Sequence, residues 1–134
     1  SPAHAFRVFT EKVDLWWPRG HRRSAEGSLR FEPGVAGRLV ERAIDGSEWI
    51  MALVTAFEPP ARLVFDWFPG SPAAPTNVEV TFAGDASQTI ITIIHQPLGA
   101  GAAEVWPQRV ALFTKGWETV LPALKVFAEQ RQSS

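Results

Sequence analysis

Apolar and polar residues alternate through the middle of the chain. This alternation predicts six β-strands, each rich in Val, Ile, Phe, Trp or Thr and bounded by Gly, Pro, Asp or Ser: 28–32, 37–43, 48–57, 61–68, 77–83 and 88–95. Only short segments separate them. Because a parallel crossover needs about a dozen residues or more, we predict an antiparallel meander. In strand 48–57 both alternating sets are apolar, so the pattern leaves open whether Trp49, Met51 and Leu53 or Ile50, Ala52 and Val54 face inward.

Helical spacing of apolar residues marks both ends of the chain. Ser1 and Pro2 are a helix start signal, and the residues after them predict one or two short helices over residues 2–17, ended by Pro18. Residues 18–27 are polar and predict a loop. Near the C-terminus, large apolar residues three or four apart predict one long helix: Trp106, Val110, Phe113, Trp117, Val120, Leu121, Leu124 and Phe127.

These elements predict a single α+β domain over residues 1–134, in which a curved sheet packs against the C-terminal helix. Rings on that helix would meet ring-bearing strand residues: Phe31, Phe65, Trp67 and Phe82. Two interpretations stay open. The rings either border a pocket for an apolar ligand between sheet and helix, or fill a solid core.

Composition argues against several classes of protein. Thirteen Lys and Arg stand against fourteen Asp and Glu, a balance that argues against nucleic-acid binding. No apolar run approaches the ~20 residues that cross a bilayer, so we expect no membrane insertion. Cysteine is absent, which favours a cytoplasmic protein. The three His lie far apart, and we expect neither a metal site nor a cofactor.

Several short motifs occur in an order and spacing that resemble a known group of proteins. They lie at residues 6–10, 15–18, 37–42, 45–48, 54–67, 92–95 and 116–121, with 58–67 (EPPARLVFDW) the strongest. The chain resembles the SRPBCC or START-like superfamily and, within it, the bacterial family named after the activator of Hsp90 ATPase. The resemblance implies a helix-grip (START/Bet v-like) fold, in which a curved sheet surrounds a long C-terminal helix and an internal cavity.

The resemblance also shows a departure at the N-terminus. The family has seven strands, the first of them before the first short helix, whereas this sequence starts at that helix. We therefore expect six strands here and a preceding segment missing from the sequence. If the strand were absent altogether, the unpaired sheet edge would favour a homodimer.

Apolar and aromatic residues around the expected cavity are candidate ligand contacts, with core packing as the alternative for each of them. They are Trp16, Trp17, Phe31, Trp49, Met51, Phe65, Trp67, Phe82, His95, Trp106, Phe113 and Trp117.

Two polar residues are candidates for proton transfer. His95 shares a strand face with Ile93, and Glu41 shares one with Leu39. The alternatives are a hydrogen-bonded His95 that closes the strand-to-helix loop and a solvated Glu41 at the sheet edge. The basic cluster 19–23 could attract an acidic ligand or partner, but we expect a solvated loop there.

The sequence thus favours a small binding module over an enzyme. Its ligand would be an apolar, aromatic or lipid-like small molecule held between the sheet and the long helix. One alternative is an enzyme resembling the superfamily's polyketide cyclases or aromatases, although only His95 and Glu41 could move protons and Tyr is absent. Another is a chaperone partner. The family name describes longer eukaryotic relatives, so nothing in this sequence supports that role.

Overall fold

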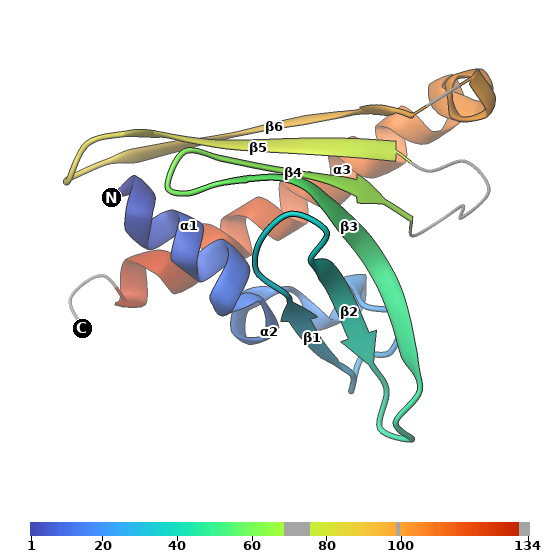
Figure 1. Ribbon diagram of the computed structural model, residues 1–134, viewed down its shortest axis with the longest axis horizontal. Coiled ribbons are helices and arrows are strands. Elements are labelled where there is room, and N and C mark those ends of the chain that lie inside the picture. Colours follow the sequence, from blue (N-terminus) through green and yellow to red (C-terminus); the bar gives the residue numbers. More distant parts are fainter. Residues whose placement is uncertain (69–75, 99, 132–134) are drawn as a thin grey trace.

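The computed structural model describes residues 1–68, 76–98 and 100–131, which form a curved antiparallel sheet with helices on its concave side (Figure 1). The strands are β1 (Ser28–Phe31), β2 (Arg38–Arg42), β3 (Glu48–Glu58), β4 (Arg62–Trp67), β5 (Thr76–Gly84) and β6 (Thr89–Pro97). They lie side by side in chain order. The predicted six-stranded meander and helix-grip arrangement are confirmed.

The helices follow the predicted order. Helices α1 (Pro2–Glu11) and α2 (Val13–Trp16) precede the sheet, a short 3-10 turn η1 (Arg19–His21) follows them, and α3 (Ala100–Arg131) ends the chain. The Ser1 hydroxyl accepts a hydrogen bond from the His4 backbone N–H at 3.3 Å and so caps α1. None of the described helices is long and apolar enough to cross a membrane.

A β-bulge in β3 resolves the ambiguity of strand 48–57. Val40 pairs with Ile50 and Leu39 pairs with Ala52, so Met51 is an extra residue in the ladder. Met51 and Ala52 are consequently both buried, although they are neighbours in sequence. Neither alternating set faces inward along the whole strand, because the bulge exchanges the two sets halfway.

The core lies mainly between the sheet and α1. Phe6 and Phe9 of α1 pack against Phe82, with ring centroids 5.2 and 5.9 Å apart, and Phe9 lies 6.1 Å from Phe31. Rings of α1 thus pack against this part of the sheet, and Phe113, Trp117 and Phe127 of the C-terminal helix pack against the same core. Phe6 and Phe9 sit three residues apart on one face of α1.

Helix α3 covers the remaining part of the concave face and passes beside α1 (Figure 1). Among its described side chains, only Val120 and Leu124 are fully buried. Within the described residues no strand pairs with the outer edge of β6. Dimerisation through that edge stays a prediction.

Candidate functional site

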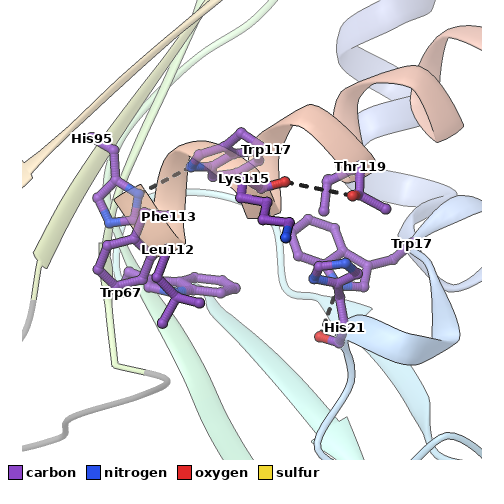
Figure 2. A pocket seen from close by; sticks show the side chains of 11 residues that line it. Trp17, His21, Trp67, His95, Leu112, Phe113, Lys115, Trp117 and Thr119 are labelled. Atoms are coloured by element: carbon purple, nitrogen blue, oxygen red, sulfur yellow. Dashed lines mark hydrogen bonds between the residues drawn. The ribbon is translucent and has the colours of Figure 1, made fainter. Parts of the chain in front are cut away.

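A pocket of about 390 Å³ opens between the end of the sheet and the middle of α3 (Figure 2). We call it the His95 pocket. Its lining comes from three parts of the chain: Trp17 and His21; Trp67 of β4 and His95 of β6; and Leu112, Phe113, Lys115, Gly116, Trp117, Thr119 and Val120 of α3. Most of this surface is apolar, and the volume is within the ~300–1,000 Å³ usual for ligand sites.

A second pocket of about 610 Å³ adjoins the first. His95, Phe113 and Trp117 line both, and Trp106 and Glu118 are among the residues that line the second alone. We call it the Trp106 pocket. The ring of Trp106 stacks on that of Phe113, with centroids 5.8 Å apart and planes 24° apart. These shared aromatic side chains form the wall between the two pockets.

Hydrogen bonds hold His95 in one orientation. The Trp117 indole Nε1–H donates to His95 Nδ1 at 3.0 Å, and His95 Nε2 lies 2.6 Å from the hydroxyl of the buried Thr76. Because an indole N–H can only donate, Nδ1 must accept, and the imidazole is neutral with its proton on Nε2. His95 thereby ties β5 and β6 to α3 and positions Trp117 beside the pocket.

Three indoles from separate elements form the apolar side of the His95 pocket. The ring of Trp17 lies 5.9 Å from Trp67 and 6.0 Å from Trp117, the latter edge to face. The Trp17 Nε1–H donates to the His21 carbonyl at 3.3 Å, which satisfies its polar atom away from the pocket.

The loop that carries His21 is held by a buried arginine. The Arg22 side chain is 1% exposed, bonds Asp14 Oδ1 at 2.7 Å and donates to the carbonyls of Asp14, Trp17 and Gly27. The expectation of a solvated basic cluster is wrong for this residue. A guanidinium has enough donors to satisfy several carbonyls at once, so it can close a tight loop from inside.

Glu41 is fully buried, at 0% exposure, and lies outside the lining of both pockets. Its carboxylate accepts the backbone N–H groups of Arg23 and Ser24 at 2.8 and 2.6 Å. The expected solvated position at a sheet edge is therefore wrong, because the 18–27 loop folds over β2. The Glu41 carboxylate thus holds the backbone of this loop in place.

The predicted ligand contacts divide into two groups. Trp17, Trp67, His95, Phe113 and Trp117 line the His95 pocket, and Trp106 lines the neighbouring one. The others lie outside both pockets: Trp16, Phe31, Trp49, Met51, Phe65 and Phe82.

Most of the second group packs beneath α1. Phe65 and Met51 are buried in the core, and Trp16 donates its Nε1–H to the Val8 carbonyl at 2.8 Å. Trp49 instead stacks under the Arg23 guanidinium, 4.4 Å from its ring centroid. Phe82 packs against Phe6 and Phe9 of α1, so at that position a helix lies where the sequence suggested a cavity.

Several pocket residues were missed from the sequence: His21, Leu112, Lys115, Gly116, Thr119 and Val120. Of these residues, Gly116 could have been identified from the sequence, because a glycine inside the apolar stripe of a long helix indicates a position with a special role. A Cβ added there would meet no atom within 4 Å, so the glycine borders open space. Among the residues that the structure describes, no three His, Asp or Glu side chains are grouped as metal ligands would be.

Comparison with known proteins agrees with this architecture. The profile of the family described as Activator of Hsp90 ATPase homolog 1-like protein matches residues 1–129. No match to a curated protein was found.

Solved structures with the same fold come from several sources. A protein from Mesorhizobium loti aligns with a TM-score of 0.65 at 18% identity, covering 97% of this chain and 90% of its own. An uncharacterized protein from Rhizobium leguminosarum aligns with a TM-score of 0.64 at 19% identity, and the alignment covers 97% of this chain and 88% of that protein. An anthrahydroquino-gamma-pyrone synthase, solved as a complex, aligns with a TM-score of 0.51 at 29% identity. The alignment covers 78% of this chain and 77% of the synthase.

Proposed function

The chain belongs to the Activator of Hsp90 ATPase homolog 1-like family, and from that premise we propose that it binds an apolar or aromatic small molecule in the His95 pocket. The observation that carries the proposal is the cluster of Trp17, Trp67 and Trp117 around an open volume of about 390 Å³. Indole rings supply large apolar contact area and favour flat, aromatic ligands.

The energetics of such a ligand are favourable. Burial of ~200 Å² of its apolar surface contributes about 5 kcal/mol before the costs of association. The two ring nitrogens of His95 already have protein partners, and its ring packs against that of Phe113, with centroids 4.2 Å apart. A neutral side chain in this position suits an apolar guest.

A second candidate function is an enzyme that closes a ring in an aromatic polyketide. It is favoured by the 29% identity to the anthrahydroquino-gamma-pyrone synthase. Against it, no hydrogen bond joins two titratable side chains within the described lining of the His95 pocket. Turnover of such a substrate that is lost in His95→Gln would raise this candidate above simple binding.

Filling the pocket from Gly116 tests the proposal. In Gly116→Leu the new side chain enters open space, and leucine favours a helix over glycine by about 1 kcal/mol, so the fold should keep its unfolding midpoint. We expect its affinity for the neutral naphthalene dye Prodan, measured by fluorescence titration, to fall more than about tenfold.

The matched control is Ala111→Leu, which adds a leucine to an exposed position of the same helix outside both pockets. It should bind Prodan as the wild type does. Undiminished binding by Gly116→Leu, or no binding by the wild type to Prodan or to other apolar and lipid-like probes, would rule out the His95 pocket as a ligand site.

A further inference from the structure

The described lining of the His95 pocket carries one formal charge, the ammonium group of Lys115. Its described lining contains His21, His95 and Lys115, and contains neither Asp nor Glu. Two carboxylates of the described residues close to it in sequence have other positions. Asp14 is bonded to Arg22 at 2.7 Å, and Glu118 lines the Trp106 pocket, beyond the wall of Phe113 and Trp117.

Lys115 supplies a positive charge at the edge of this pocket. The side chain leaves α3 and extends toward the rings of Trp17 and His21 (Figure 2). Within the described residues it forms no ion pair, whereas Lys125 on the same helix lies 3.6 Å from Glu129. The residue one turn after Lys115 is Thr119, which has no charge to offer. The ammonium is thus available to a ligand at low cost.

His21 approaches the same edge from another element. Its backbone is fixed by the Trp17 indole and by the neighbouring buried Arg22, so its imidazole is held beside the pocket. Two basic side chains from η1 and α3 therefore flank one end of an apolar, indole-lined space. An aromatic molecule in that space would place a substituent at this end between them.

We propose that the ligand of the His95 pocket is an aromatic carboxylic acid, whose rings lie among Trp17, Trp67 and Trp117 and whose carboxylate is bound by Lys115 and His21. This inference rests on the proposed function and specifies its ligand class. Charge-assisted hydrogen bonds are shorter and stronger than neutral ones, so the acid should bind better than a neutral molecule of the same shape.

A pair of ligands that differ only in charge provides the test. Calorimetric titration with naphthoic acid and its neutral amide, naphthamide, should give about five- to tenfold tighter binding of the acid near pH 7. In Lys115→Gln the preference should shrink to about twofold or less, with the affinity for naphthamide unchanged. The control Lys125→Gln, on the same helix, should keep the full preference.

Each contrary result has a distinct meaning. Equal binding of acid and amide, or a preference that survives Lys115→Gln, overturns the acidic ligand and leaves the pocket intact. If neither naphthalene derivative binds but Prodan does, the ligand class is wrong and the binding function stands. If no apolar probe binds either, the binding function itself fails, and this inference fails with it.

Discussion

Glu41 shows what a single residue does for the site without touching it. Its buried carboxylate accepts the N–H groups of Arg23 and Ser24, and together with Arg22 it fixes the loop that presents His21. A buried acid without such partners would cost several kcal/mol, so the loop and the carboxylate stabilise each other.

Replacing this carboxylate should loosen the loop. In Glu41→Gln the side chain stays similar in shape but loses its charge and one acceptor, and hydrogen bonds to charged groups contribute about 1.5–3 kcal/mol each. We expect amide hydrogen exchange at Arg23 and Ser24 to accelerate at least about tenfold. Glu26→Gln, an exposed change in the same loop, should leave both rates unaltered. Equal protection in the two variants would contradict this role of Glu41.

At the scale of elements, the β1–β2 hairpin is closed by an ion pair across its turn. Arg38 donates Nε and Nη2 to the two carboxylate oxygens of Glu32 at 2.8 and 2.7 Å. The hydrogen bonds from Arg38 lower the pKa of Glu32 from its ordinary 4.5 to about 2. Gly37 is required in the same turn, because a Cβ there would lie 2.2 Å from the Glu32 carbonyl oxygen.

This pair should make the hairpin's contribution to stability depend on pH. The pKa of Glu32 is lower in the folded than in the unfolded protein, so its stabilisation is complete above the unfolded value of 4.5 and is lost as the pH falls toward about 2. Glu32→Gln should therefore lower the denaturant midpoint near pH 7, and the difference from wild type should vanish near pH 2. A difference that is constant across this range would contradict the pairing.

Over the whole molecule, α3 has two different tasks. The part around Leu124 packs into the core, whereas Leu112 to Trp117 borders the pockets. Val120 lies between the two parts and is both buried and part of the pocket lining. The apolar stripe that predicts this helix therefore lines the pockets along its first part and is buried in the core along its second part. One amphipathic helix therefore lines the site with its middle and packs into the core with the part that follows.

Leucines from the two parts of α3 should respond differently to truncation. Leu124 is 1% exposed, and Leu124→Ala should lower the free energy of unfolding by about 2–5 kcal/mol. Leu112 is 69% exposed, and Leu112→Ala should change it by less than about 0.5 kcal/mol. Chemical denaturation of both variants measures this. Similar losses would show that the pocket end of the helix is also part of the core.

Local patterns predicted the elements of this protein because strand alternation, helix spacing and turn residues act between neighbours in sequence. The six strands, the Ser1-capped helix and the long C-terminal helix follow from them, and motif order is enough to identify the family. For the site, the same patterns singled out Trp17, Trp67, His95, Phe113 and Trp117 only as members of a larger set of apolar and aromatic candidates.

Tertiary packing decided which of those rings border open space. Phe82 has the same chemistry as the pocket residues, but Phe6 and Phe9 of α1 pack against it, and the bulge at Met51 reverses the faces of β3. The partners of Glu41 and Arg22, and the approach of Lys115 to His21, join segments distant in the chain. Whether a side chain is covered depends on which distant segment of the chain packs over it, and the local periodicity of the sequence does not encode that.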